Sequence, residues 1–116
     1  MTRRKEIVER YFEGFRRSDH ELILSCLTDD VLWEIHGHRT LTGKEAFDAE
    51  IENEGFEGSP ALTVDRLVEE GDTIVAVGTG TVAKSDGGAL EFVFSDVFTF
   101  NRDAIGRIET YQVNLS

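Results

Sequence analysis

The segment Glu91–Phe100 constrains the fold more than any other stretch, because it predicts a long β-strand with two chemically different faces. Phe and Val dominate it, and neither Gly nor Pro interrupts it. Side chains alternate across a strand, so one face carries four phenylalanines and one carboxyl group, in the order Phe92, Phe94, Asp96, Phe98 and Phe100. The other face carries Val93, Ser95, Val97 and Thr99. The fold must therefore cover an aromatic face that contains one acid.

Asp96 is the first candidate for a functional group. An ionised carboxylate among phenylalanines is unfavourable unless it is paired, hydrated or protonated, since desolvation raises the pKa of an Asp. A carboxyl group with a raised pKa suits acid or base chemistry. Two structural interpretations stay open, namely a pair with an arginine and contact with water at the mouth of the sheet.

Length and charge limit the possible functions. A chain of 116 residues predicts one domain, residues 1–116, with one core. Hydrophobic residues make up 40% of the chain, which is typical of a folded protein. The 23 Asp and Glu outweigh the 12 Lys and Arg and give a net charge of −11. This charge repels phosphates, so neither nucleic acid nor an anionic membrane surface is an expected partner.

The chain also lacks several targeting and metal-binding patterns. No apolar stretch has the length of a signal peptide or a membrane span. The lone Cys26 excludes an internal disulfide, so we expect a cytoplasmic protein in which Cys26 is a small core residue. No paired cysteines, metal-ligand spacing or Gly-rich phosphate loop occurs, and we expect neither a metal nor a cofactor.

Three helices are predicted in the first half of the chain. Residues 2–17 repeat apolar side chains at helical spacing, at Ile7, Val8, Tyr11, Phe12 and Phe15. Residues 18–21 fit a capping box that opens a short second helix, with Leu22, Ile23, Cys26 and Leu27 buried. Residues 42–45 fit another, opening a third helix that buries Ala46, Phe47 and Ile51.

Strands and turns fill the rest. Residues 28–30 are predicted to turn, and 31–36 to form a strand with Trp33 and His36 on opposite faces. A mobile loop is expected at 53–60, and further strands are expected at 61–69, 73–84, 91–100 and 105–115. Gly78 and Gly80 suggest a bulge, a bend or a close approach of a ligand. This order predicts an α+β fold with helices on one face of a mainly antiparallel sheet.

Several short motifs follow one another along nearly the whole chain, at residues 11–12, 29–34, 41–46, 95–100 and 106–109. Their order and spacing resemble the nuclear transport factor 2-like (NTF2-like) superfamily, specifically its SnoaL-like polyketide cyclase and ketosteroid isomerase-related branch. The resemblance implies a cone-shaped barrel, in which three N-terminal helices wrap a strongly curved sheet around an apolar pocket. It also implies a homodimer through the outer sheet face, toward which Val93 and Val97 would point.

The resemblance assigns roles to particular residues. Asp96 matches the isomerase's protonated aspartic acid, and Tyr11 matches its oxyanion-hole tyrosine, although Tyr11 fits equally well as a half-buried core residue. The isomerase's proton-abstracting aspartate falls at Ile35, or at His36 with a slip of one residue. Because Ile35 cannot move a proton, a steroid isomerase mechanism is not expected. In the cyclase branch an aspartate inside the sheet is the acid/base, a role that Asp96 could take with help from His36 or His38.

The sequence leaves alternative interpretations open for the histidines and for the residues that could line the pocket. Alternation sends the His36 side chain to the face opposite Trp33, whereas a bulge near Gly37 would turn it inward. His38 is expected in a loop, and His20 is expected in solvent at a helix start. Side chains that fit either a pocket wall or the core are Phe15, Trp33, Ile35, Phe47, Phe92, Phe94, Phe98, Tyr111 and Val113.

Three functions follow as hypotheses. The first is an enzyme, an isomerase or a cyclase, that moves protons on a small apolar carbonyl compound. The second is a non-catalytic module that binds a small hydrophobic molecule in the same pocket. The third is a dimerisation scaffold whose pocket is filled by its own phenylalanines.

Overall fold

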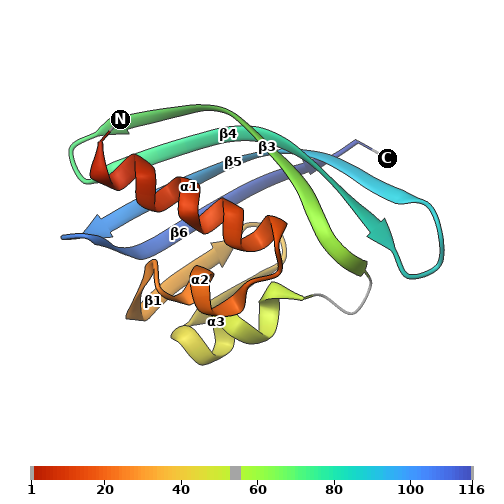
Figure 1. The fold of residues 1–116 in the computed structure, drawn as a ribbon, viewed down its shortest axis with the longest axis horizontal. Coiled ribbons are helices and arrows are strands. Elements are labelled where there is room, and N and C mark those ends of the chain that lie inside the picture. The colour runs from red at the N-terminus through yellow and green to blue at the C-terminus, as the bar shows by residue number, and fades with distance from the viewer. Residues whose placement is uncertain (1, 53–55, 116) are drawn as a thin grey trace.

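The structure, a computed structural model, describes residues 2–52 and 56–115. In that part of the chain three helices and six strands follow one another (Figure 1). The helices are α1 (Arg3–Arg16), α2 (His20–Leu24) and α3 (Lys44–Ile51). The strands are β1 (Leu27–Ile35), β2 (Arg39–Thr42), β3 (Phe56–Glu70), β4 (Thr73–Lys84), β5 (Ala89–Asn101) and β6 (Ala104–Asn114). None of the described helices is long and apolar enough to span a membrane.

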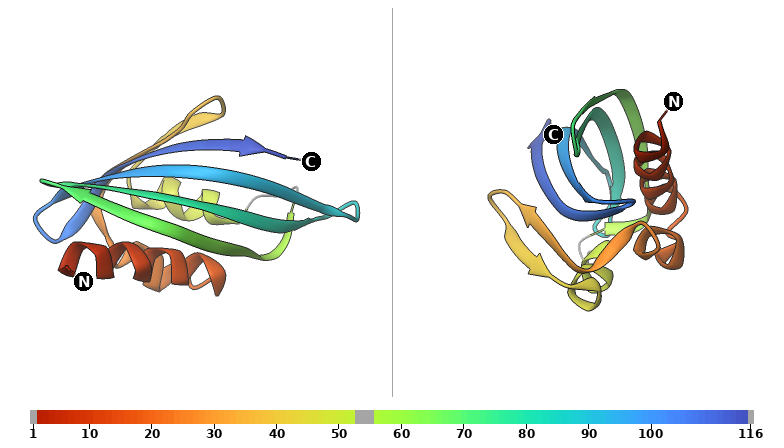
Figure 2. Two further views of the ribbon diagram at one scale, coloured as in Figure 1. Left: turned by 90° about the horizontal axis from the view of Figure 1, so that it is seen from above. Right: turned by 90° about the vertical axis from the view of Figure 1, so that its left-hand side faces the viewer.

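The strands form one sheet in the order β2-β1-β6-β5-β4-β3. Only the β1–β6 pair is parallel, and the other described pairs are antiparallel. The sheet curves strongly, and the helices lie on the inner side of the curve (Figure 2). Its two edge strands do not pair with each other, so the fold is an open cone. The predicted α+β class and the curved, mainly antiparallel sheet are confirmed.

Helix α1 places one apolar stripe against the sheet. Its buried residues recur at the helical spacing read from the sequence, and Thr2 caps the start by accepting the backbone N–H of Lys5 at 3.2 Å. The ring of Tyr11 packs edge-on against Phe98 of β5, with 5.2 Å between the centroids. Burying this stripe therefore fixes α1 across the inner face of the sheet.

Strand β5 lies between β4 and β6 and has the two faces that its sequence predicts. All five residues of the aromatic face are buried: Phe92, Phe94, Asp96, Phe98 and Phe100. The opposite residues, Val93, Ser95, Val97 and Thr99, are partly exposed. The acid is thus held on the inner side of the sheet by the pleat of the strand itself.

The two β4 glycines face phenylalanine rings of β5. Gly78 pairs with Phe94 and Gly80 pairs with Phe92. A Cβ atom at Gly80 would lie 2.3 Å from Cζ of Phe92, and one at Gly78 would lie 2.8 Å from Cζ of Phe94. The space at these glycines is therefore filled by the rings of the neighbouring strand, and at Gly78 also by the carbonyl oxygen of Thr63, and is not left for a ligand. The β4–β5 register runs without a shift at both glycines, and the bulge beside Gly78 lies in β3 instead, between Val64 and Arg66.

Both predicted capping boxes are wrong. The side chain that caps α2 is that of Asp19, which accepts the Leu22 N–H at 3.1 Å. Ser18 instead takes a left-handed conformation, with φ +49°, and contacts Ser59. Reversing the chain after α1 needs a left-handed residue, which moves the cap along by one. At α3 the cap position is Gly43, which has no side chain to bond, and Thr42 ends β2.

Long-range pairing extended β1 and β3 beyond the local prediction and added the strand β2. Residues 28–30 continue β1 and do not turn, and 39–42 form β2, which was not predicted. Residues 56–60 of the expected mobile loop belong to β3, where Phe56 pairs with Lys84. Residues 53–55 of that loop lie outside the described residues. Pro60 is tolerated because β3 is an edge strand with a register shift at this point.

Candidate active site

A cavity of about 970 Å³ lies on the inner side of the sheet. Its walls come from α1, β1, the β1–β2 turn, the end of α3 and the inner faces of β3 to β6. Phe and Leu side chains of β5 and aromatic residues of α1 make much of this lining. The cavity places Asp96, Tyr11 and Thr110 around a space large enough for a ligand of several rings.

Asp96 lies on the cavity wall and is 7% exposed. Its Oδ1 atom is buried and has no hydrogen-bond partner among the described residues. Burial raises the pKa of Asp96 to about 7, and a hydrogen bond from Thr110 limits the rise. No Lys, Arg or His of the described chain pairs with it. The arginine-paired interpretation of this carboxyl group is therefore excluded for these residues.

A short hydrogen-bond chain holds the Asp96 carboxyl group in place. Thr110 lies opposite Asp96 in the β5–β6 register. Its Oγ1 atom accepts the indole N–H of Trp33 at 3.0 Å, and its hydroxyl bonds the Asp96 carboxyl. An indole nitrogen can only donate, so the proton of the Thr110 hydroxyl is free for the carboxyl. One carboxyl oxygen is thereby engaged, and Oδ1 is buried without a hydrogen-bond partner among the described residues.

Tyr11 lies on the same cavity and is 2% exposed. Burial, and then the negative charge of Asp96, raises the pKa of Tyr11 well above its usual value. The phenol therefore stays protonated at all ordinary pH values and can act as a hydrogen-bond donor. Its ring packs against Phe15, with 5.0 Å between the centroids, so its direction is fixed by the core.

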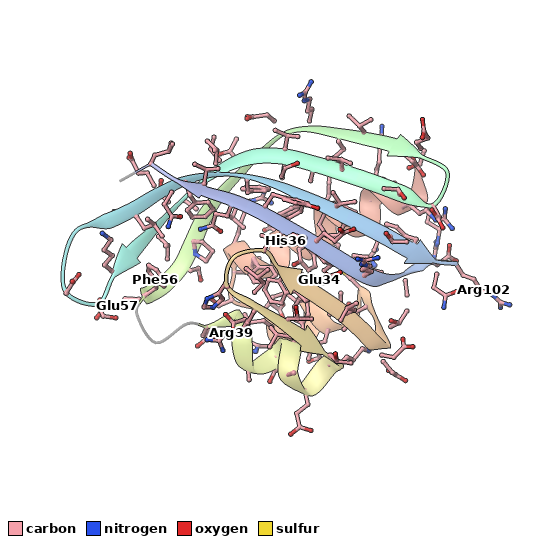
Figure 3. The ribbon with its side chains drawn as sticks, turned by 180° about the vertical axis from the view of Figure 1, so that it is seen from behind. Glu34, His36, Arg39, Phe56, Glu57 and Arg102 are labelled. Carbon is pink, nitrogen blue, oxygen red and sulfur yellow. The ribbon has the colours of Figure 1, made fainter. Side chains whose placement is uncertain are left out.

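His36 lies at the rim of the cavity, with its ring packed toward the outer face. The ring stacks on Tyr111 at 4.4 Å, and its Nε2 atom lies 3.9 Å from Glu109. The nearby Glu34 accepts the Arg107 Nε–H at 2.8 Å, and Figure 3 shows Glu34 and His36 along β1 from this side. The inward turn considered for His36 does not occur, because the strand alternation holds to the end of β1.

The other two histidines are paired with carboxylates. His38 lines the cavity, and its Nε2 atom lies 3.6 Å from Glu50, which also pairs with Arg39 at 3.3 Å. His20 joins α2 to α3, with its two ring nitrogens each 2.6 Å from a carboxylate oxygen, of Asp48 and Glu52. A neutral imidazole has one N–H, so two such bonds favour the charged form and raise the pKa of His20.

No three His, Cys, Asp or Glu side chains of the described ranges gather closely enough to hold a metal ion. Cys26 is buried and unpaired, and burial raises the pKa of its thiol. This placement fits the small core residue expected from the sequence and gives the thiol no role at the cavity.

The family model for the SnoaL-like domain matches residues 8–110. The chain belongs to the SnoaL-like family. The predicted resemblance to the SnoaL-like branch of the NTF2-like superfamily is thereby confirmed. A comparison with curated proteins found no match.

Solved structures share the fold of this SnoaL-like domain. TerC, co-crystallised with polyporic acid, is 24% identical over 95% of this chain and 91% of its own, with a TM-score of 0.85. A putative SnoaL-like polyketide cyclase from Jannaschia sp. CCS1 is 20% identical over 95% and 85%, with a TM-score of 0.85. An LEH-like epoxide hydrolase from M. tuberculosis is 15% identical over 96% and 83%, with a TM-score of 0.84. At these identities the likeness establishes the fold alone.

The SnoaL-like cavity is lined by five of the nine expected wall residues, Phe15, Trp33, Ile35, Phe92 and Phe94. Phe47 and Phe98 are fully buried and support the lining from behind. Phe47 stacks on Trp33 at 4.3 Å, and Phe98 packs on Tyr11.

Tyr111 and Val113 are not cavity walls, because they lie on the outer face, 47% and 61% exposed. The physical reason is a bulge at Gly106. Phe100 pairs with Ile105 but Thr99 pairs with Arg107, so β6 has one extra residue there. Every later side chain of β6 changes face.

The same bulge turns three polar residues of β6 into the cavity, namely Thr110, Gln112 and Asn114. The sequence did not predict these three residues as cavity walls, because their apolar neighbours Tyr111 and Val113 fitted that role better. Gly106 could have indicated the bulge, since it is a glycine inside a predicted strand. It does not show, however, on which side of it the alternation of side chains shifts.

Proposed function

We propose that this protein is an enzyme that performs acid/base chemistry on a small apolar carbonyl compound, without a cofactor, as an isomerase or a cyclase. One observation carries this proposal: Asp96 lies on the wall of a cavity of about 970 Å³ and has a buried carboxyl oxygen with no hydrogen-bond partner among the described residues. Perturbed carboxyl groups in apolar cavities are the usual acids and bases of such reactions. The names of the polyketide cyclase and epoxide hydrolase neighbours support an enzymatic role for this fold.

The proposed mechanism uses Asp96 in both of its forms. With a pKa of about 7, the group exists as carboxylate and as acid near neutral pH. The carboxylate takes a proton from the carbon next to the substrate carbonyl, and the Tyr11 hydroxyl donates a hydrogen bond to the oxygen that becomes an enolate. Returning the proton to another carbon gives an isomer. Attack of the same carbanion on a second carbonyl closes a ring, and the alkoxide that results takes the proton held by Asp96.

Ile35 separates this proposal from a steroid isomerase mechanism. It lines the cavity with an aliphatic side chain at the position where the resemblance places the isomerase's base. Proton transfer in this chain therefore falls to Asp96, whose carboxyl is held by Thr110.

The proposal is tested with 2-tetralone, an apolar ketone whose acidic C–H protons exchange with D₂O through the enolate. We expect the wild-type protein to accelerate this exchange, measured by proton NMR, and the Asp96→Asn variant to lose about 100-fold or more of the acceleration. Asp86→Asn makes the same chemical change in the β4–β5 turn and should exchange like the wild type. Exchange no faster than in buffer, or equal in Asp96→Asn and wild type, overturns the proposal.

A second candidate is a non-catalytic module that binds a hydrophobic ligand. Ile35 and the phenylalanine lining favour it, because they bind apolar surface and move no proton. Its signature in the same experiment is binding of 2-tetralone, seen as shifted protein amide signals, with no exchange above buffer. The third hypothesis, a pocket filled by the chain's own side chains, does not fit a cavity of this volume beside Asp96.

We further propose that two copies associate through the outer sheet face. This face exposes Tyr111, Val113 and Leu115, with Val93 and Val97 partly exposed beside them. Apolar side chains gathered on one sheet face are typical of a surface that a partner covers. A cytoplasmic location, which we also propose, suits the free Cys26 thiol.

A further inference from the structure

The cavity lining has an apolar row beside a polar row, whose outer members Gln112 and Asn114 are exposed. On β5 the inward residues leading away from Asp96 are Phe94 and Phe92. Their partners on β6 are Gln112 and Asn114, and Thr110 is the partner of Asp96. A ligand lying along the strands from Asp96 therefore meets phenyl rings on one side and carboxamides on the other.

The strand geometry sets the spacing along this polar row. Two residues of an antiparallel strand advance by roughly 6.8 Å, so Gln112 lies one such repeat beyond the Asp96–Thr110 pair. The β1–β2 turn runs beside the same part of β6, since Ile35 pairs with Thr110 and the His36 ring stacks on Tyr111. The next residues of the turn, Gly37 and His38, line the cavity there.

The chemistry at Gln112 points to a hydroxyl group on the ligand. Its Nε2 atom donates to Asn114 Oδ1 at 2.9 Å, which orients the carboxamide along the strand. A carboxamide that makes this bond keeps its own carbonyl oxygen, an acceptor, for another group. Glu50 and Glu52 also line the cavity, and the chain carries a net charge of −11, so an anionic group would be repelled.

We propose that Gln112 determines specificity by accepting a hydrogen bond from a ligand hydroxyl, about 7 Å along the strands from the oxygen held at Asp96 and Tyr11. The ligand class is a hydroxylated compound of at least two rings, with its apolar face on Phe92 and Phe94. His38 of the β1–β2 turn lines the same cavity. The inference rests on the proposed function in one respect, because that function places the first oxygen at Asp96.

The test compares 2-naphthol with 2,6-naphthalenediol, which adds a hydroxyl at the far end of the same two rings. Dissociation constants are measured by fluorescence titration at about pH 6, where Asp96, with a pKa of about 7, is mainly protonated and can donate to the first oxygen. We expect the wild type to bind the diol more tightly. Gln112→Leu should reduce the ratio of the two constants by roughly threefold to tenfold, the range of one hydrogen bond, and leave 2-naphthol binding unchanged.

Comparing the ratio between proteins cancels the advantage of a diol with two equivalent hydroxyls. Tyr111→Phe is the matched control, since it removes a polar group from the adjacent β6 residue on the outer face and should keep the wild-type ratio. In a second measurement, the diol but not 2-naphthol should shift the NMR signals of the Gln112 side-chain amide.

The subsite is overturned if the wild type does not prefer the diol or binds neither compound, if Gln112→Leu keeps the ratio, or if it weakens both compounds equally. These outcomes are separate from the fate of the proposed function. If the protein accelerates exchange of 2-tetralone but Gln112→Leu keeps the wild-type ratio of dissociation constants, only the subsite is rejected. A reduced ratio without exchange rejects only the chemistry and leaves a binding protein with a hydroxyl subsite.

Discussion

At the scale of single residues, the site depends on a carboxyl group, that of Asp96, which the fold buries at a cost in stability. Asp96 loses contact with water on folding, and among the described residues only Thr110 offers its carboxyl group a hydrogen bond in return. The cost is visible as a raised pKa, because burial penalises the charged form. A neutral residue in place of Asp96 should therefore raise stability at pH values above this pKa, so the stability of variants at this position reports the cost directly.

The first prediction concerns the pH dependence of stability. The pKa of Asp96 rises from 3.8 to about 7 on folding, so between these values the native state keeps a proton that the unfolded state releases. Its contribution is fully present below about pH 4 and is lost as the pH rises through 7. Asp96→Asn should therefore be more stable than wild type at about pH 8, by roughly 2 to 4 kcal/mol, and nearly equal to it at about pH 4.

Urea unfolding at the two pH values measures this difference. The Asp86→Asn variant is the control, and it should follow the wild type at both values because this turn residue does not line the cavity. A wild-type stability that rises between about pH 5 and pH 7, with Asp96→Asn following it in parallel, would contradict a raised Asp96 pKa.

At the scale of elements, the cavity wall depends on how closely β4 and β5 fit. The rings of Phe92 and Phe94 lie over Gly80 and Gly78, where any side chain would occupy the same space. These two rings are also the apolar row of the cavity lining. The glycines of β4 thus determine the shape of the site from a neighbouring strand, without lining the cavity.

The second prediction is that Gly80→Ala destabilises the fold by about 1 to 3 kcal/mol, the usual cost of overpacking. The added Cβ would lie 2.3 Å from Cζ of Phe92, so the ring must move, and 2-naphthol binding should weaken with it. Thr79→Ala alters the exposed face of the same strand and should change stability by less than about 0.5 kcal/mol. Thermal unfolding measures both, and equal effects in the two variants would refute the ring contact as the cause.

At the scale of the whole molecule, the two faces of the sheet have separate tasks. The inner face carries the core and the cavity, while the outer face exposes Tyr111, Val113 and Leu115. Since β5 and β6 contribute alternate residues to both faces, a dimer through the outer face would brace the strands that carry Asp96 and Gln112.

The third prediction is that the protein sediments as a dimer, at twice the chain mass of 13.0 kDa, in analytical ultracentrifugation. Val113→Lys places a charge in the proposed interface and should shift the protein to the monomer mass, since buried unpaired charge opposes association. Ala49→Lys adds the same charge on the exposed side of α3 and should leave the dimer intact. A monomeric wild type, or dissociation of the dimer in both variants, would contradict a dimer interface on the outer sheet face.

Much of the site could be predicted from local patterns. The alternation in β5 placed Asp96 among phenylalanines, and the helical spacing placed Tyr11 on the buried stripe of α1. The motifs at residues 95–100 and 41–46 indicated the family, which the match over residues 8–110 confirmed. These inferences hold because strand and helix periodicities depend only on neighbours in the chain.

The sequence by itself determined the class of fold, the inward face of β5 and the candidate acid, since each follows from the order of residues along one element. The tertiary structure alone decided that Thr110 and Gln112 face the cavity while Tyr111 lies on the outer face. The physical reason is that one extra residue at Gly106 reverses the faces of β6. Such a bulge is fixed by pairing between strands, and no local pattern records which residues will pair.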